Sequence, residues 1–223
     1  DVATSVASGV ESGVGTSVSE RVVTGVLRID SRDLAAGDLF LAIQGGNVDG
    51  HDFLAQAHEN GAVAAIVDHV VADAPADLLQ LVVPDTIAAL TALARDHARR
   101  LAATTTIVGI TGSSGKTTTK DLTAQVLEAA GTTIAPPGSF NNEIGLPTTV
   151  LRADESTRFL VLEMGSRGIG HIAHLVDIAA PRIGVVLSIG SAHAGEFGGR
   201  EGTAQAKGEL SGGLPTDGAA ILN

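Results

Sequence analysis

The chain has 223 residues, of which 44% are hydrophobic and 2% aromatic, and it carries 14 Lys and Arg against 25 Asp and Glu. This composition supports a packed core and excludes disorder, while a formal charge of -11 excludes a basic nucleic-acid-binding surface and zero Cys excludes disulfides and thiol catalysis. No signal-peptide pattern or membrane-spanning run is found, so we expect a cytoplasmic protein that binds neither membrane nor nucleic acid.

The first half of the chain alternates strands with helices. We assign no function to residues 1–20, which are rich in Ser, Gly and Val. Residues 22–29 are predicted to form an extended run, and residues 39–43, 62–67 and 79–83 to form strands, the last two of them buried. A helix begins near Phe53 and is closed by Gly61, and a second helix spans residues 86–101. Strands separated by such helices indicate a mainly parallel sheet.

The second half repeats this alternation after residue 103. The predicted strands are 105–110, 133–135, 158–163 and 183–189, with a further strand entered within 217–223. The predicted helices are 115–130, 147–151, 170–179 and 200–211. We therefore expect an α/β protein of two domains, residues 1–103 and 104–223.

A glycine-rich turn follows the strand 105–110 and precedes a helix. The turn and the start of the helix consist of Gly112, Ser113, Ser114, Gly115, Lys116, Thr117 and Thr118. Backbone N–H groups and a helix N-terminus would cradle phosphates there, with Lys116 on the β- and γ-phosphates and the Thr117 hydroxyl on Mg²⁺. The match to the P-loop pattern is imperfect, because the expected glycine lies one residue early, at Gly109. The alternative is an ordinary Gly/Ser turn.

Three further residues are candidates for the same edge of the sheet. Glu163 ends an apolar strand and is a candidate Mg²⁺ ligand, or alternatively a solvated acid at a strand end. His193 follows the strand 183–189 and could equally be structural or exposed. Lys207, taken alone, is typical of a solvated helix lysine.

Several strings of the sequence resemble the Mur ligases of peptidoglycan synthesis. They lie at residues 109–119, 140–147 (Phe-Asn-Asn-Glu-Ile-Gly-Leu-Pro), 163–165, 191–193 and 206–210, with further matches at 30–32, 37–40 and 49–53. The resemblance spans nearly everything after residue 20. Folylpolyglutamate and cyanophycin synthetases share the phosphate loop but not the first half.

The resemblance implies an ATP-dependent, two-step amide ligation. The terminal carboxylate of UDP-N-acetylmuramoyl-tripeptide would attack the γ-phosphate of ATP to give an acyl phosphate, and D-alanyl-D-alanine would then displace phosphate. The alternatives are the related ligase that adds the third peptide residue, and a nucleotide-binding P-loop module without ligase chemistry.

The resemblance also implies roles for individual residues. ATP would contact the phosphate loop, Asn141 and Asn142, and the catalytic residues would be Lys116, His193 and Lys207. Two Mg²⁺ ions would be held by Thr117, Glu163, His193 and a Lys207 carbamylated by CO₂. UDP-sugar binding would involve Ser31, Arg32, Asn47 and His51. The alternatives are turn chemistry for the Asn pair, and for the first half a turn at 30–32 and a loop at 49–50 with Asp52 as a helix N-cap.

The family pattern includes a third domain that receives the amino substrate. The sequence ends at Asn223 within the expected ATPase domain. We therefore expect residues 1–103 to bind the UDP-sugar peptide, residues 104–223 to form a truncated P-loop NTPase-like domain, and the chain alone to be inactive.

Overall fold

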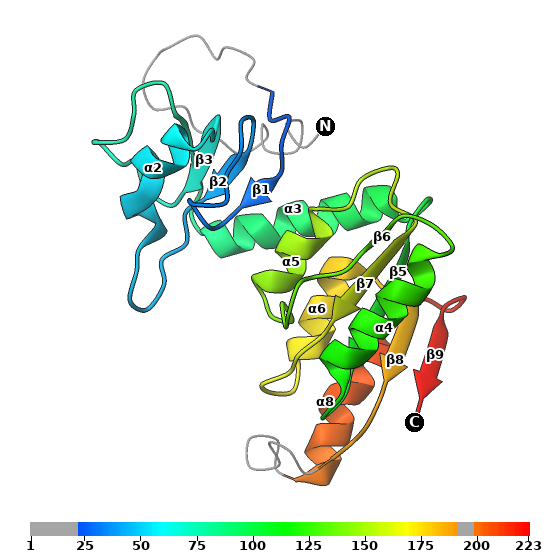
Figure 1. The fold of residues 1–223 in the computed structure, drawn as a ribbon. Coiled ribbons are helices and arrows are strands. Elements are labelled where there is room, and N and C mark those ends of the chain that lie inside the picture. Colours follow the sequence, from blue (N-terminus) through cyan, green and yellow to red (C-terminus); the bar gives the residue numbers. More distant parts are fainter. Residues whose placement is uncertain (1–21, 191–198) are drawn as a thin grey trace. The chain divides into compact units, whose positions relative to one another are not determined.

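The computed structural model describes residues 22–190 and 199–223, and the chain divides into two compact units, Asp1–Leu93 and Ala94–Asn223 (Figure 1). Each unit contains its own parallel sheet, which confirms the predicted α/β class. The division falls inside helix α3 (Thr86–Leu101), whose predicted bounds are also confirmed. Within the described part of the chain, no helix combines the length and apolar character needed to cross a membrane.

The first unit is built on a four-stranded parallel sheet in the order β1-β2-β3-β4. The strands are β1 (Leu27–Arg28), β2 (Leu39–Leu41), β3 (Ala64–Val67) and β4 (Leu79–Val82). Between β2 and β3 the chain forms the 3₁₀ turn η1 (Gly50–Phe53) and helix α2 (Leu54–Glu59). The small core joins sheet and helix through Phe40, Leu54, Ala57, Ala65 and Val67.

One prediction for this unit is wrong. Residues 79–83 were expected to form a buried strand, but in the described part of the chain β4 lies at the edge of the sheet, pairs with β3 alone, and leaves Leu79 38% exposed. An apolar strand is buried on both faces only when layers cover both sides of the sheet. The extended run predicted over 22–29 contains the two-residue strand β1 at the opposite edge.

The second unit contains a five-stranded parallel sheet in the order β6-β7-β5-β8-β9. The strands are β5 (Thr106–Thr111), β6 (Thr133–Ile134), β7 (Phe159–Glu163), β8 (Ile183–Val186) and β9 (Ala219–Leu222). The helices are α4 (Lys116–Glu128), α5 (Gly145–Val150), α6 (His171–Ala179) and α8 (Arg200–Gly212).

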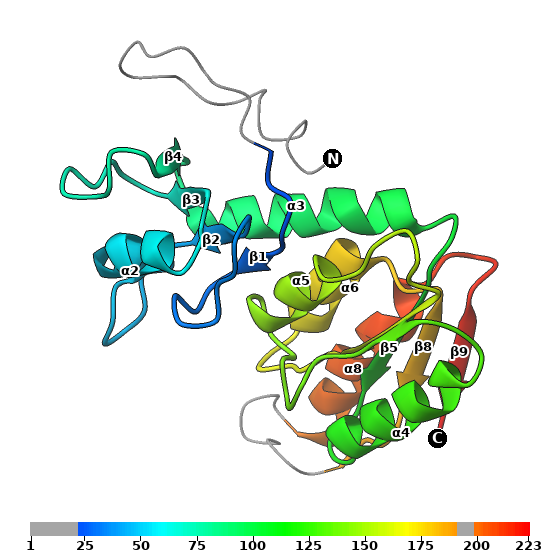
Figure 2. The same ribbon diagram turned by 45° about the horizontal axis from the view of Figure 1, so that its top comes forward.

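Helices cover both faces of this second sheet (Figures 1 and 2). Alternate strand residues explain the division, because Ile107 and Leu160 pack in one cluster with α5, α6 and α8, while Val108 and Val161 pack in another with α4. A parallel sheet covered in this way leaves the loops at the carboxyl ends of its strands for ligands. The phosphate loop, Asn141 and Glu163 lie at these ends of the second sheet.

Candidate functional site

The phosphate-loop residues lie between the end of β5 and the start of α4. Gly115 is the N-cap of α4 and has φ 79°, a left-handed conformation that suits glycine. At Gly112 a Cβ would lie 2.9 Å from the Cβ of Leu187, so the turn packs directly against the segment after β8. The loop therefore requires glycine at two of its positions for distinct reasons.

The segment that follows β8 braces this turn. The amide of Ser113 donates to the Ser188 carbonyl at 3.0 Å, and the Ser113 hydroxyl accepts from the Gly190 amide at 2.9 Å. The strand predicted over 183–189 ends earlier, at Val186. The residues that follow it turn toward the phosphate loop and form these contacts instead. Two strand ends thus fix the conformation of the turn.

Lys116 is the first residue of α4, and its ammonium donates to the Gly112 carbonyl at 2.9 Å. Its charge therefore lies over the turn that the glycines form. Thr118, two residues on, is exposed and presents its side chain to solvent beside the same helix end. Together with the free N–H groups of the first helical turn, this arrangement concentrates positive potential at the carboxyl edge of β5.

Glu163 is the point where three segments converge. It ends β7 with only 1% of its surface exposed, and its two carboxylate oxygens accept from the Thr117 hydroxyl at 2.8 Å and from the Asn141 side-chain amide at 2.7 Å. The Thr117 hydroxyl also lies 3.4 Å from that of Ser139. Hydroxyl, carboxylate and amide oxygens are the donor set that Mg²⁺ prefers, so these residues fit that ion.

Lys207 lies on α8 and is 6% exposed. Burial, followed by the positive charge of Lys116, lowers the pKa of its ammonium. Among the residues that the structure describes, no hydrogen bond or ion pair forms at this ammonium. The helix is held in place two residues later, where Glu209 accepts the backbone amides of Gly170 and Ala173 at the start of α6.

Asn142 is placed differently from Asn141. Its side-chain oxygen accepts from the amides of Ile144 and Gly145, at 3.3 and 2.8 Å, and so caps the start of α5. This contact corresponds to the turn chemistry that the sequence left as an alternative. Asn141 alone of the pair reaches Glu163.

A third lysine, which the sequence reasoning missed, is fully buried below this site. Lys120, one turn after Lys116, donates to the carbonyls of Pro136 and Gly138 at 2.5 and 2.9 Å and pairs with Asp121 at 2.9 Å. It thereby ties α4 to the loop that carries Asn141. A lysine within the apolar-periodic part of a helix, followed by a Pro/Gly loop, is the only sequence signal for such a contact.

In the first unit, Ser31 and Arg32 follow β1. Ser31 is buried, its hydroxyl donates to Gln56 at 2.6 Å, and its carbonyl accepts from Asn60 at 2.8 Å. Arg32 is exposed and forms a two-pronged pair with Asp30, at 2.9 and 2.6 Å. That pair lowers the pKa of Asp30 to about 2, with the Arg32 side chain as the main cause.

Asn47 and His51 follow β2. Asn47 is exposed in the turn that the Gly45 amide closes on the Val48 carbonyl at 2.8 Å. His51 is 4% exposed and lies in η1. The turn is capped by Asp49, whose side chain accepts from the His51 amide at 3.0 Å, so the suggestion of Asp52 as the N-cap is wrong, because Asp52 lies inside η1.

The structure brings one set of predicted residues into contact and places a second set after two strands of the first sheet. Lys116, Thr117, Asn141 and Glu163 meet at the carboxyl edge of the second sheet, with Lys207 close enough to Lys116 for their charges to interact. Ser31, Arg32, Asn47 and His51 all follow strands at the carboxyl edge of the first sheet. His193 lies outside the described residues.

Comparison with protein families identifies two regions of the chain. Residues 110–223 match the Mur ligase middle domain, and residues 24–110 match the family described as "Mur ligase family, catalytic domain". The match to the middle domain, over residues 110–223, contains Lys116, Thr117, Glu163 and Lys207.

Individual relatives agree with these matches. A UDP-N-acetylmuramoyl-tripeptide--D-alanyl-D-alanine ligase from Mycobacterium bovis is 48% identical over 227 residues, covering 92% of this chain and 44% of the relative. A crystal structure of MurF from Acinetobacter baumannii has a TM-score of 0.79 at 37% identity, covering 88% of this chain and 42% of that one. A MurF ligase structure from Thermotoga maritima, in complex with ADP, has a TM-score of 0.77 at 36% identity, with 90% and 46% covered. The chain thus spans less than half the length of these relatives.

Proposed function

The chain belongs to the Mur ligase family, and from that premise we propose that it acts within an ATP-dependent ligase that joins D-alanyl-D-alanine to UDP-N-acetylmuramoyl-tripeptide. The observation that carries the proposal is the convergence of Thr117 and Asn141 on the buried Glu163, beside a glycine turn that opens a helix. This arrangement provides a phosphate cradle and a hard-cation site at one edge of one sheet.

ATP binds, in this proposal, with its phosphates over the turn formed by Gly112, Ser113, Ser114 and Gly115. Lys116 and the first N–H groups of α4 neutralise the phosphate charge. Thr118 lies at the exposed start of the helix, where it would contact the nucleotide. The net charge of -11 does not oppose binding, because the local backbone dipoles and Lys116 set the field at the site.

Thr117 and Glu163 fit Mg²⁺, and Asn141 holds the Glu163 carboxylate in position for it. When bound, the ion would neutralise charge on the β- and γ-phosphates and so lower the cost of attack by an anionic carboxylate. The chain's own contribution is to fix these oxygens before ATP arrives. Asn142, by capping α5, keeps Asn141 oriented toward the site.

Two bond changes make up the proposed reaction. A carboxylate oxygen of the tripeptide attacks the γ-phosphorus of ATP, the bond to the β-phosphate oxygen breaks, and ADP leaves. The amine of D-alanyl-D-alanine then attacks the acyl carbon, phosphate leaves, and the amine gives up a proton. The protein's task is to align two anions and exclude water, which requires positive charge and fixed geometry more than a strong base.

Lys207 would serve as a carbamate. A neutral amine attacks CO₂ and loses a proton, so the lysine becomes an anionic oxygen donor for a second Mg²⁺, together with His193. The lowered pKa of Lys207 supports this role, because burial and Lys116 favour the neutral amine that the addition requires. The chain has lysines only at positions 116, 120 and 207, so ¹³C-bicarbonate NMR should show a lysine carbamate signal that disappears in Lys207→Arg.

Residues 1–103 are proposed to bind the UDP-sugar peptide, and residues 104–223 to bind ATP. Ser31, Arg32, Asn47 and His51 all follow β1 or β2 at the edge where open α/β sheets bind ligands. Arg32 is the exposed cation of this group and the natural partner for a diphosphate. His51, being buried, would act by holding the loop that carries Asn47.

We place the reaction in the cytoplasm, where ATP and nucleotide-activated precursors are found. The identity of 48% to a ligase named for D-alanyl-D-alanine favours that amino substrate over addition of the third peptide residue. A P-loop module without ligase chemistry would have no use for a buried lysine whose pKa is lowered beside the phosphate loop.

Thermal unfolding of the tag-free chain with UDP-N-acetylmuramoyl-tripeptide tests the substrate assignment. Saturating ligand should raise the unfolding temperature, since a hundredfold excess over Kd contributes about 2.7 kcal/mol. Arg32→Ala should reduce the shift, and Arg152→Ala, an exposed site in the other unit, should leave it unchanged. The absence of any shift in the wild-type chain would contradict the assignment.

A further inference from the structure

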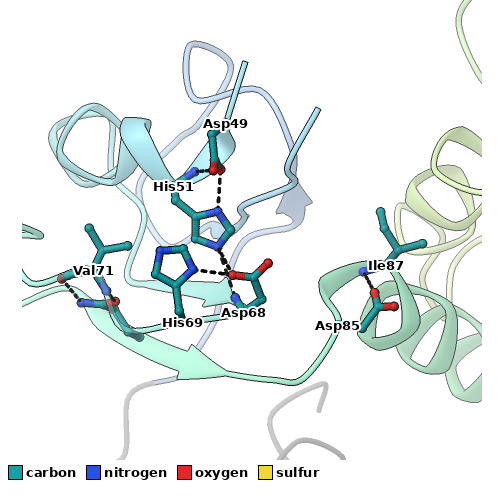
Figure 3. Close-up of polar contacts among 8 residues, drawn as sticks. Asp49, His51, Asp68, His69, Val71, Asp85 and Ile87 are labelled. Carbon is teal, nitrogen blue, oxygen red and sulfur yellow. Dashed lines mark hydrogen bonds and ion pairs between the residues drawn. The ribbon is translucent and has the colours of Figure 1, made fainter. Parts of the chain in front are cut away.

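Asp49, His51, Asp68 and His69 form a cluster at the carboxyl edge of the first sheet (Figure 3). The cluster belongs to the first unit, whereas the proposed ATP site belongs to the second. His51 comes from η1, while Asp68 and His69 directly follow β3. The two imidazole rings stack with centroids 4.5 Å apart, and both are turned toward the Asp68 carboxylate. We propose that His51, Asp68 and His69 form a site for a divalent transition-metal ion, with Zn²⁺ as the preferred occupant.

The donor atoms already lie at distances close to those of a metal site. Asp68 Oδ1 is 3.2 Å from His51 Nε2 and 2.5 Å from His69 Nδ1, and one donor atom from each of the three residues lies within 4.8 Å of the others. Donors bound to a tetrahedral zinc ion at about 2.0–2.2 Å are separated by roughly 3.3–3.5 Å. Small side-chain rotations, rather than backbone movement, would therefore suffice to admit the ion.

The contacts of His51 orient it as a metal ligand. Its Nδ1 lies 2.6 Å from Asp49 Oδ1, which selects the tautomer with the proton on Nδ1 and the lone pair on Nε2. A carboxylate that accepts from the remote ring nitrogen is the usual partner of a metal-bound histidine. Among the described residues, Nε2 accepts the Asp68 amide alone, at 3.2 Å, which is long for a hydrogen bond, so a metal can take its place.

The chemistry of the donors selects the class of ion. Two imidazole nitrogens and one carboxylate suit Zn²⁺ and its neighbours in the transition series, whereas Mg²⁺ and Ca²⁺ prefer oxygen donors alone. The side chains of Asp68 and His69 are 35% and 61% exposed, while that of His51 is 4% exposed. An ion would thus have one buried anchor, an open path from solvent, and room to keep a water ligand.

The bound ion would link two segments of the first unit that are 17 residues apart in sequence. It would join the loop after β2 to the end of β3 and should stabilise that unit, since a ligand bound by the native state alone adds to its stability. The inference is independent of the ATP site. It shares His51 with the proposed UDP-sugar region, so the test uses Asp68 and His69, which have no role in the proposed ligation.

The test is a titration of tag-free, metal-free chain with Co²⁺, whose visible absorption reports four-coordinate binding, followed by displacement with Zn²⁺. We expect one saturable site per chain. Asp68→Asn and His69→Gln should each weaken binding at least tenfold, and Asp49→Asn about 10–100-fold through the orientation of His51. His58→Gln is the matched control, because His58 lies in the same unit and also pairs with a carboxylate, at 3.2 Å from Asp77, outside the cluster.

Two variants separate this inference from the proposed function. Glu163→Gln should retain the Co²⁺ site, and His69→Gln should retain Mg²⁺-dependent ADP binding. In the wild-type chain, Zn²⁺ should shift the imidazole NMR signals of His51 and His69. This measurement uses no variant, so it does not depend on whether a variant folds. The inference is overturned if Co²⁺ does not saturate at one per chain, if Asp68→Asn and His69→Gln bind as the wild type does, or if those two imidazoles do not respond.

Discussion

The Thr117 hydroxyl donates to the Glu163 carboxylate at 2.8 Å and so connects the second residue of α4 with the last residue of β7, 46 positions later. β7 is the immediate neighbour of β5, which delivers the phosphate loop. The parallel topology therefore places a hydroxyl and a buried carboxylate side by side without any local sequence relationship. A pair held in this way is organised before a ligand arrives, which is what electrostatic catalysis requires.

Gly115→Ala should destabilise the chain by about 1–2 kcal/mol, because residue 115 has φ 79° and a Cβ is strained in that conformation. Urea unfolding measures the loss. Gly208→Ala is the matched control, since a Cβ there meets nothing within 4 Å in the middle of α8, and it should stabilise by roughly 0.5–1 kcal/mol. Equal effects of the two substitutions would refute the conformational explanation.

Lys120→Met should release the loop at residues 136–142 from α4. The carbonyls of Pro136 and Gly138 would lose their donor, at a cost of about 1–3 kcal/mol. Hydrogen exchange should accelerate at the Gly165 amide, which donates to the Asn141 carbonyl in that loop at 2.9 Å. Asp121→Asn removes only the exposed partner of Lys120 and should change stability by less than about 1 kcal/mol. Unchanged exchange in Lys120→Met would show that the lysine does not hold the loop.

Lys207→Met should be more stable than the wild type at neutral pH in CO₂-free buffer. The pKa of Lys207 is lowered from 10.5, so its charged form is less favourable in the folded chain than in the unfolded one. Between the lowered pKa and 10.5 the unfolded state binds more protons, and wild-type stability therefore rises with pH. The advantage of Lys207→Met should shrink as pH rises through this window.

Urea unfolding at several pH values measures this difference. Arg200→Met, which removes an exposed cation from the first residue of the same helix, should show no such pH dependence. A Lys207→Met variant less stable than the wild type at neutral pH would contradict the burial argument and would weaken the case for a carbamate.

Arg32→Ala should raise the pKa of Asp30 from about 2 part of the way toward 3.8, because the Arg32 side chain is the largest cause of the shift while the residue 32 amide remains. A carboxyl ¹³C NMR titration measures the change. Because its pKa is lowered, ionised Asp30 stabilises the folded chain at pH values above 3.8, and this stabilisation is lost as the pH falls toward 2. The variant lacks most of this contribution, so it should lose less stability in acid. Binding of a UDP-sugar diphosphate to Arg32 should likewise raise the pKa of Asp30, and an unchanged value in Arg32→Ala would refute the pairing.

The helix pattern and the phosphate loop could be predicted from the sequence because their signals are local. Periodicity gave α3 at its observed bounds, and the order of strand, glycine turn and Lys-Thr pair located the loop. Burial of β4 could not be predicted in this way, since an apolar run does not reveal whether its strand lies inside a sheet or at its edge.

The contacts that assemble the site are long-range, and this explains what sequence reasoning missed. Lys120 reaches carbonyls 16 and 18 residues away, and His51 reaches Asp68 after 17 residues. No pattern in one sequence encodes these partners, because they depend on which strands become neighbours. Asn141 and Asn142 illustrate the same limit, since two adjacent identical residues have different partners.

The most direct test of the central claim is calorimetric titration of the tag-free chain with ADP, in the presence and absence of Mg²⁺, for the wild type and Glu163→Gln. We predict that Mg²⁺ tightens ADP binding to the wild type and that Glu163→Gln removes most of this gain, about tenfold or more in Kd. Binding of ADP without Mg²⁺ should change little. An equal gain from Mg²⁺ in both proteins, or no ADP binding to either, would contradict the account.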